Sequence, residues 1–265
     1  VADGAPKSAR LSLHEGDTLA ATWSTAIDDA GAATHVARLG DTLLAFGASV
    51  HAVDRASGKV LRSTPLGPSA VVTDLVTGVD GVYAVVLVRD RKERVITKIA
   101  ADGTIAWSRR TNATLDAVIA SHVLTVSGDE LTALSVADGS VAWSGKLPSP
   151  SSGSGVVVPP VTSTPSAITP VWVLPHRRGV HAVDAASGAV RFDVSPFGKA
   201  TTDGAVDHLS VAEDGLVIAD GARGVAGIEI GHEGHARYVI AVRSLEHVQR
   251  GARLGRLAEL RLRHA

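Results

Sequence analysis

A repeated phrase limits the fold of this chain more strongly than any other feature of the sequence. The phrase reads VHAVDRASG at residues 50–58 and VHAVDAASG at residues 180–188. Further copies centre on Gly103 and Gly139, and a degraded copy centres on Gly234. Successive turn glycines, counted from Gly58, are 36 to 49 residues apart. Spacings of this size are typical of stacked repeat units, each of which buries a face against its neighbour.

An aromatic residue stands four positions after the glycine in four of the five copies: Trp107, Trp143, Phe192 and Tyr238. The whole chain contains only 4 Trp, 2 Tyr and 3 Phe, so chance does not explain this clustering. We expect these side chains to fill the space between neighbouring units. The glycines Gly58, Gly103, Gly139, Gly188 and Gly234, together with Trp107, Trp143 and Phe192, are therefore predicted to be the structural residues of the repeat.

Each unit has the pattern of antiparallel β-strands. The V-x-A-V segment alternates with period two, as a half-buried strand does. The following D-x-A-S-G favours a hairpin turn, because Asp and Ser cap the turn and Gly adopts a left-handed conformation without steric cost. Another apolar run, such as residues 82–88, precedes each pair, and a weaker one, such as residues 71–76, comes earlier still. Four strands per unit predict the blade of a β-propeller.

We therefore predict an all-β fold in which residues 1–238 form a β-propeller of four-stranded blades. About five blades are visible, with a partial one at the N-terminus, as part of a seven- or eight-bladed ring. A helical repeat would need two long amphipathic stretches per unit, and none occurs before residue 239. The segment 149–166, rich in Ser, Gly and Pro, is predicted to be a long surface loop.

Residues 239–265 are predicted to form a separate basic tail, helical in one interpretation. From residue 243 onward the chain carries six Arg and two Glu, so the tail is basic and the remainder is acidic. A basic amphipathic helix could rest on an anionic membrane or on a partner protein. Two alternatives stay open: a helix that closes an incomplete ring, and out-of-frame sequence. Gly251 and Gly255 weaken the helical interpretation.

The repeat resembles the pyrroloquinoline-quinone-type propeller repeat, whose blades carry an Ala-Leu-Asp-x-x-Thr-Gly-x-x-x-Trp phrase. Residues 52–58 match the front half of this phrase, with Ser57 in the place of Thr. Residues 103–107 match the back half. The resemblance extends over about residues 11–238 and implies a quinoprotein-like propeller. It is not a WD40 pattern, because no Gly-His…Trp-Asp pairs occur at the blade ends.

Within this superfamily two groups are most similar. One is the luminal propeller of ER membrane protein complex subunit 1, which residues 43–53 and 82–92 resemble. The other is the bacterial periplasmic propeller that assists outer-membrane protein assembly. We favour the first, which implies a scaffold on the luminal face of the endoplasmic reticulum that binds other protein subunits of a membrane-associated complex for membrane-protein insertion and folding. The second implies a periplasmic scaffold and stays open as the alternative.

The name of the repeat also suggests a quinone-dependent dehydrogenase. Such enzymes use a vicinal Cys pair and a Ca²⁺ site built from Glu, Asn and Asp, whereas this chain has no Cys and Asn112 is its only Asn. The histidines of His232-Glu-Gly-His235 are three residues apart rather than the four of a zinc-protease helix. His51 and His181 share one repeat position and are interpreted as strand-face residues. We therefore expect no enzyme: no catalytic residue, no cofactor and no metal ligand.

Charge and hydropathy exclude two classes of partner. The formal net charge is −1, which argues against a nucleic-acid binder, since such proteins neutralise phosphates. The longest apolar run, residues 82–88, is too short to span a bilayer, so we expect no transmembrane segment. The mixed-sign run 89–94 is interpreted as a solvated hairpin, with partner docking as the alternative. The absence of Met indicates a processed product, a fragment or an incomplete gene product.

Asn112 begins an Asn-Ala-Thr sequon and follows the last strand of a predicted blade. A surface loop is expected at this point, so Asn112 is a candidate for N-glycosylation. Glycosylation would place the chain in the secretory lumen and favour the endoplasmic reticulum over the periplasm. The alternative is a chance match, because Ser and Thr are common in this chain.

Overall fold

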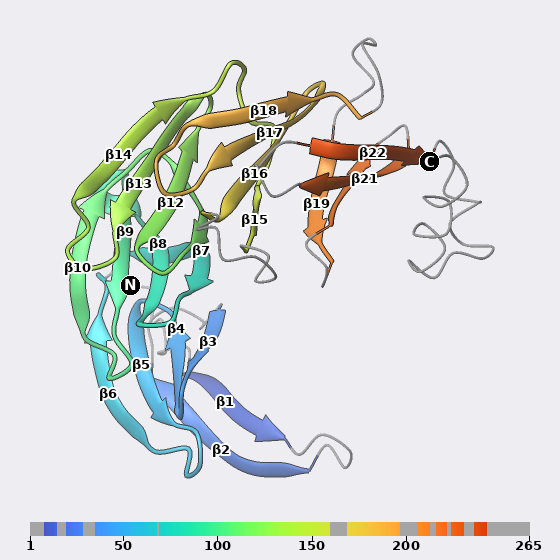
Figure 1. Cartoon of the computed structure of the whole chain (residues 1–265). Helices are drawn as coiled ribbons and strands as arrows, with labels where there is room; N and C mark the ends of the chain where they lie inside the picture. Colours follow the sequence, from blue (N-terminus) through green and yellow to red (C-terminus); the bar gives the residue numbers. More distant parts are fainter. Residues whose placement is uncertain are drawn as a thin grey trace. The chain divides into compact units, whose positions relative to one another are not determined.

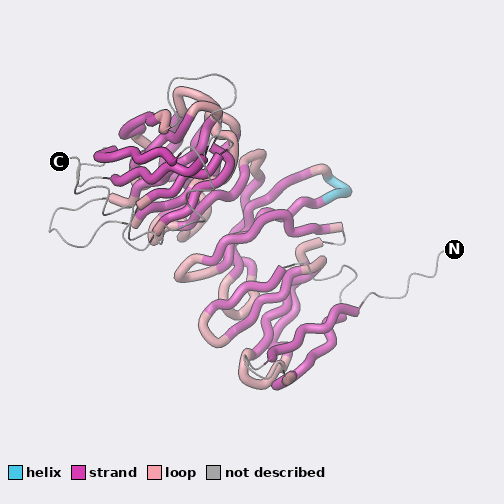
Figure 2. The backbone as a smooth tube through the Cα atoms, turned by 90° about the vertical axis from the view of Figure 1, so that its right-hand side faces the viewer, coloured by secondary structure: helices cyan, strands magenta, loops and turns pink. Residues whose placement is uncertain are grey.

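The chain is described from a computed structural model, which describes residues 8–14, 20–28, 35–67, 69–159, 169–196, 206–212, 216–221, 224–230 and 236–242. Strands make up nearly all of the regular structure in these residues (Figures 1 and 2). The helical segment drawn in Figure 2 is a single 3₁₀ turn, η1 (Arg89–Arg91). The predicted all-β fold is therefore confirmed.

The strands form five four-stranded sheets and one two-stranded sheet, with hydrogen bonds between strands that follow one another in the chain. This is the arrangement of propeller blades, so the predicted four-stranded blades and their expected number are confirmed. The two-stranded sheet is β1 (Ser8–His14) with β2 (Ala21–Asp28).

The first two blades are β3 (His35–Leu39), β4 (Thr42–Phe46), β5 (Ser49–Asp54), β6 (Val60–Pro65), and β7 (Ala70–Thr77), β8 (Val82–Val88), β9 (Glu93–Ile99), β10 (Ile105–Arg110). The third is β11 (Thr114–Val118), β12 (His122–Ser127), β13 (Glu130–Ser135), β14 (Val141–Lys146). The last two are β15 (Val156–Val158), β16 (Val171–His176), β17 (Gly179–Asp184), β18 (Val190–Val194), and β19 (Val206–Val211), β20 (Val217–Gly221), β21 (Gly224–Ile230), β22 (Ala236–Val242).

The chain divides into two compact units, and each is considered by itself. The first contains Val1–Val126 and Thr132–Ala142, and the second contains Ser127–Leu131 and Trp143–Ala265. The described residues of the first unit thus include the two-stranded sheet and the first two blades. Those of the second unit include the last two blades.

Two predicted boundaries differ from the structure. The segment 149–166 is not wholly loop, because Val156–Val158 forms β15 and pairs with β16. Three consecutive β-branched residues favour a strand here, although the Ser, Gly and Pro around them are typical of loops. At the other end β22 runs to Val242, so residues 239–242 belong to a strand rather than to a helical tail. The rest of the predicted tail, residues 243–265, lies outside the described residues.

The cores lie between consecutive sheets. One cluster joins the first two blades through side chains such as Leu44, Val50, Val82 and Ile99, all of them fully buried. Because a middle strand has a neighbouring sheet on each face, its side chains are buried on both. The first five residues of β8, Val82–Val86, are all buried, for example. Parallel-sheet strands show the same continuous apolar pattern for the same reason.

Burial on both faces corrects the interpretation of two histidines. His51 and His181 were expected to alternate out of the core, yet only 4% and 0% of their surface is exposed. The alternation itself is present, since each lies on the face opposite the neighbouring Val and Ala. The opposite face of the sheet is covered as well. A side chain that points away from one core is therefore also buried.

Aromatic rings on outer strands lie against the turn glycines of the next blade. Trp107 on β10 contacts Gly139, and a Cβ built on that glycine would lie 2.7 Å from the ring. The ring of Trp143 on β14 lies in the same way against Gly188, where the distance would be 2.5 Å. Trp23 on β2 lies against Gly58. Each ring therefore requires a residue without a side chain in the neighbouring turn.

The turn glycines also need left-handed backbone conformations. The φ angles of Gly58, Gly139 and Gly188 are +72°, +72° and +78°, in a region that other residues adopt only with strain. The Asp at the start of the turn caps it: Asp54 Oδ1 accepts bonds of 2.8 Å from the Ser57 amide and 2.6 Å from its hydroxyl. These bonds hold the pKa of Asp54 below its ordinary value.

A buried lysine makes a further link between the second and third blades. Lys98 Nζ on β9 donates to Asp80 Oδ2 at 2.7 Å and to the carbonyl oxygen of Val136, after β13, at 2.8 Å. The Tyr83 hydroxyl donates to Asp80 Oδ1 at 2.8 Å. Burial raises the pKa of Asp80, but its bonds from Lys98 and Tyr83 lower it below the ordinary value. The ammonium group is thus fully compensated.

We predict that Gly188→Ala destabilises the fold far more than Gly128→Ala does. Both glycines have positive φ, but a Cβ at Gly128 would meet nothing within 4 Å. Gly128→Ala should therefore lower the free energy of unfolding by about 1 kcal/mol from backbone strain alone. Gly188→Ala adds the clash with Trp143, which brings the expected loss to about 3 kcal/mol. Urea denaturation measures both, and equal losses would contradict the ring–glycine contact.

We also predict that Trp107→Ala lowers the free energy of unfolding by about 3 kcal/mol, the low end for buried aromatics, because the ring is only partly covered. It loses the contact with Gly139 and the bond of 3.1 Å from Nε1 to the Val136 carbonyl. Thermal and urea unfolding followed by circular dichroism would test this. Wild-type stability would show that the ring does not hold the two blades together.

Candidate functional site

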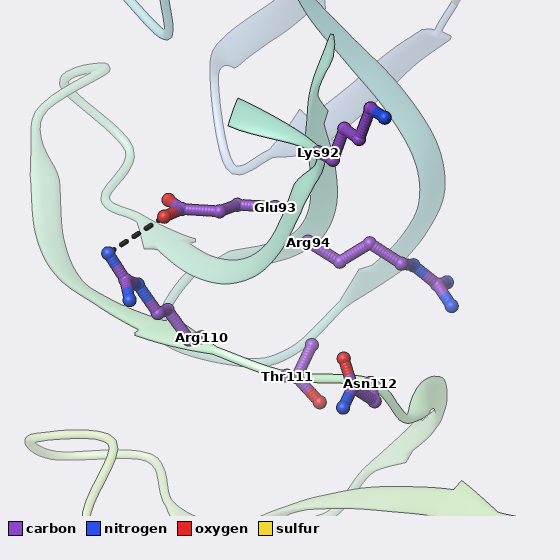
Figure 3. Close-up of a pocket in the computed structure, with 6 residues that line it drawn as sticks. All are labelled: Lys92, Glu93, Arg94, Arg110, Thr111 and Asn112. Carbon is purple, nitrogen blue, oxygen red and sulfur yellow. Dashed lines mark ion pairs between the residues drawn. The ribbon is translucent and has the colours of Figure 1, made fainter. Parts of the chain in front are cut away.

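The described residues include an open, basic recess in the second blade (Figure 3). It has a volume of about 360 Å³ and is lined by Lys92, Glu93 and Arg94 from the β8–β9 hairpin, by Arg110 at the end of β10, and by Thr111 and Asn112 after it. The Arg110 guanidinium pairs with Glu93 at 2.7 Å. The lining residues carry three cationic side chains and one carboxylate, so the recess is basic; Arg94 also interacts electrostatically with Asp74 on β7.

Hydrogen bonds fix the backbone conformation around the recess. Lys92 has a left-handed conformation with φ of +52°, and its amide donates to the carbonyl oxygen of Arg89 at 3.1 Å. The Thr111 amide donates to the carbonyl of Arg94 at 2.9 Å, which ties the two sides of the recess together. Residues 89–92 of the mixed-sign run thus form the predicted exposed turn between β8 and β9, whereas Glu93 and Arg94 begin β9 and are half-buried. Carboxylates of a partner could bind here.

Asn112 is exposed in the connection between β10 and β11. The surface loop expected for the sequon is therefore present. Glycosylation itself stays a prediction. Because Asn112 also lines the recess, a glycan there would cover it.

A polar pair recurs between the third and fourth strands of the blades. His51 Nδ1 lies 2.9 Å from Ser63 Oγ in the first blade, and Thr97 Oγ1 lies 3.1 Å from Ser108 Oγ in the second. In the fourth blade the same positions hold His181 and Asp193, which are directly opposite in the β17–β18 register. Buried polar groups need partners, and these pairs supply them.

In the fourth blade the pair becomes a cluster of three titratable groups. His176, at the end of β16, lies on the same face, so His176, His181 and Asp193 place one nitrogen or oxygen each within 4.8 Å of one another. Asp193 Oδ1 is 3.1 Å from His176 Nε2, and Oδ2 is 3.4 Å from His181 Nδ1. The two rings are stacked with centroids 4.1 Å apart. The sequence analysis missed this cluster, since only the strand register brings His176 to it.

The surroundings of His181 decide its protonation. Burial lowers the pKa of His181, and the neighbouring His176 lowers it further, while Asp193 and Ser149 act in the opposite direction. The net direction is downward. His181 Nε2 lies 2.9 Å from Ser149 Oγ, whereas Nδ1 is buried with no hydrogen-bond partner. The neutral ring is therefore the stable form in the fold.

The other predicted residues lie as follows. Gly58, Gly103, Gly139 and Gly188 all have positive φ at the ends of turns. Phe192 is partly buried against the core of the last two blades. Gly234, together with His232 and His235, lies outside the described residues, and so does the side chain of Tyr238. In the described part of the chain no helix is long and apolar enough to cross a membrane.

We predict that the free energy of unfolding decreases as the pH falls from about 7 to about 5, because unfolded His181, with its ordinary pKa of 6.5, binds a proton more readily than the buried ring. His181→Gln should flatten this dependence. Urea denaturation across this pH range, with a chelator present, would measure it. An unchanged slope in the variant would show that His181 does not contribute.

Two solved structures share the fold at low sequence identity. BamB from Moraxella catarrhalis aligns with a TM-score of 0.54 and 14% identity, over 79% of this chain and 64% of that one. Quinohemoprotein alcohol dehydrogenase ADHIIG from Pseudomonas putida HK5 aligns with a TM-score of 0.51 and 17% identity, over 78% of this chain and 41% of that one. The chain thus spans less than two thirds of either protein. A comparison with curated proteins finds no match.

The match of a family model is more specific. The model described as outer membrane protein assembly factor BamB matches residues 9–211. This span contains the two-stranded sheet, four complete blades and the first strand of the fifth. The chain therefore belongs to the BamB family of pyrroloquinoline-quinone-type β-propeller proteins.

Proposed function

We propose that this chain is a non-catalytic propeller scaffold that binds other proteins during outer-membrane protein assembly in the bacterial periplasm. The observation that carries the proposal is the family match over residues 9–211, which extends from the two-stranded sheet to the first strand of the fifth blade. The comparisons lend no support to the endoplasmic reticulum interpretation that the sequence analysis favoured. They support its bacterial alternative instead.

The outer strands of the blades offer a surface for such binding. The first strands of neighbouring blades contact one another, as β3 does with β7 and β7 does with β11. The fourth strands lie at the opposite edges of the sheets, as β6 and β10 do in Figure 1. An edge strand has backbone groups that its own sheet does not pair. Partners can bind such an edge by adding a strand.

Apolar side chains are exposed on these same outer strands. Leu61 on β6 is 55% exposed and Val141 on β14 is 44% exposed. Ile105 on β10 and Val190 on β18 are each 38% exposed. The last three share one repeat position, two residues after the turn glycine, so the exposure is a property of the blade. The basic recess beside β10 adds a place for acidic groups of the same partner.

A quinone-dependent dehydrogenase is the rival from another functional class, since one similar fold is that of a quinohemoprotein alcohol dehydrogenase. The residues that such enzymes use argue against it, because the chain has no Cys and a single Asn, which is exposed on a loop.

We predict that a photo-crosslinking residue at Leu61 or Ile105, expressed in the periplasm of the source bacterium, forms adducts with proteins of the outer-membrane assembly machinery, identified by mass spectrometry. Val79 is the matched control, because it is apolar and 93% exposed but lies in the β7–β8 connection, away from the outer edges. It should give few adducts or none.

Two results would contradict the proposal. One is the absence of adducts with assembly proteins from every outer-strand position. The other is dye-linked dehydrogenase activity of the purified chain after addition of pyrroloquinoline quinone and Ca²⁺, which would favour the enzymatic rival.

A further inference from the structure

We propose that His176, His181 and Asp193 form a binding site for one divalent transition-metal ion, and that Zn²⁺ is the ion that this ligand set favours. The site is separate from the recess, and only Asp193 belongs to an outer strand, β18. It lies within a single blade, so it needs no other chain and no neighbouring blade to supply its three protein ligands.

Strand register brings the three side chains to one face of the blade. His181 on β17 is opposite Leu174 on β16 and opposite Asp193 on β18. His176 is two residues beyond Leu174, so its side chain projects from the same face. Two imidazoles and one carboxylate from three adjacent strands therefore converge. Ligands on strands are held more rigidly than ligands on loops.

Two separations between ligand atoms are close to those around a tetrahedral ion; they involve the two different oxygens of Asp193, and the three ligand groups lie within 4.8 Å of one another. Zn²⁺ lies about 2.0–2.1 Å from imidazole nitrogens and carboxylate oxygens, which places neighbouring ligand atoms of a tetrahedron roughly 3.3 Å apart. Asp193 Oδ1 is 3.1 Å from His176 Nε2, and Oδ2 is 3.4 Å from His181 Nδ1. The first of these also suits a hydrogen bond. The second distance is long for a hydrogen bond, and His181 Nδ1 has no hydrogen-bond partner.

An orphaned, fully buried nitrogen is the second observation that indicates a ligand. His181 is 0% exposed, and its Nε2 already has Ser149 Oγ as a partner at 2.9 Å. Leaving Nδ1 without a partner in the interior costs free energy, and a metal ion would remove that cost. Ser149 Oγ would then accept a hydrogen bond from Nε2–H and fix the ring orientation, as outer partners of metal-bound histidines do.

Metal binding requires a change of tautomer at His176 and a reorientation of the stacked histidine rings. His176 Nδ1 accepts a long bond of 3.3 Å from the Arg178 amide, and ligation through Nε2 needs the other tautomer, so this bond is given up. The stacked rings of His176 and His181, 14° from parallel, must also tilt toward a common point. Asp193 provides access, since 44% of its side chain is exposed and water can take a fourth position there.

The first blade shows what the cluster adds to the ordinary polar pair. His51 is buried at the position equivalent to His181, but Ser63 stands in the place of Asp193 and Gly47 in that of His176. One imidazole and a hydroxyl cannot hold such an ion. The donor set of the fourth blade, with two imidazoles, favours Zn²⁺ over Ca²⁺ and Mg²⁺, which take oxygen ligands.

The test is isothermal titration of the metal-free full chain with Zn²⁺, and separately with Ca²⁺. We expect one Zn²⁺ per chain, no comparable binding of Ca²⁺, and a higher melting temperature with Zn²⁺ present. Asp193→Asn keeps the size of the side chain and should weaken Zn²⁺ binding by at least about tenfold. Binding should also decrease as the pH falls, because protons compete for the imidazoles.

His51→Gln is the matched control, because it alters a buried histidine at the same repeat position in a blade that lacks the other two ligands. It should bind Zn²⁺ like the wild type. His176→Gln gives a second loss-of-binding variant if Asp193→Asn fails to fold, and circular dichroism establishes folding for each. The histidine ring signals in NMR spectra should shift on Zn²⁺ addition for His176 and His181 alone.

Three outcomes would overturn the proposal: no stoichiometric binding of Zn²⁺, binding that Asp193→Asn and His176→Gln leave intact, or an equal loss in His51→Gln. Any of them would show that the cluster is only a hydrogen-bonded pair of histidines on a carboxylate. None would bear on the proposed scaffold function, which the crosslinking experiment tests separately.

Discussion

The contact between an aromatic ring and a turn glycine of the next sheet is the interaction on which the blades depend. Trp107 against Gly139 and Trp143 against Gly188 are two instances of one device, in which a large apolar surface covers a turn that has no side chain. It works only if the turn has positive φ, which glycine alone adopts without strain. Where the ring is missing, Arg62 takes its place and lies 3.9 Å from Asp102 of the next turn.

Stacking of sheets has a second consequence, which is burial on both faces of the middle strands. Polar side chains that would face water in an open sheet are then enclosed and must find partners. Lys98 does so with Asp80 and a backbone carbonyl, and His51 does so with Ser63. The fourth blade uses the same positions, and there the pair is extended to the cluster of His176, His181 and Asp193 that we propose as a metal site.

The proposed scaffold function rests on the surfaces that the blades leave exposed. Within each unit the first strands of neighbouring blades contact one another, whereas the outer strands carry exposed apolar side chains and the recess opens beside β10. Apolar residues on the edges and a net positive recess are the features of a protein-binding surface, in which apolar contacts are surrounded by complementary charge.

The sequence by itself determined the repeat, most of its strands, the turn glycines and the five blades that the described residues contain, because each of these depends on local patterns: alternation, turn chemistry and an aromatic at a constant offset. Only the tertiary structure decided which polar residues meet. His176 lies outside the repeated phrase, and only strand register places it beside His181 and Asp193. The strand β15 could not be recognised from sequence, because the residues around it have the composition of a loop. Strand register, and the burial of the second face of a sheet by its neighbour, depend on contacts between segments far apart in the sequence. No pattern within one segment can therefore predict them.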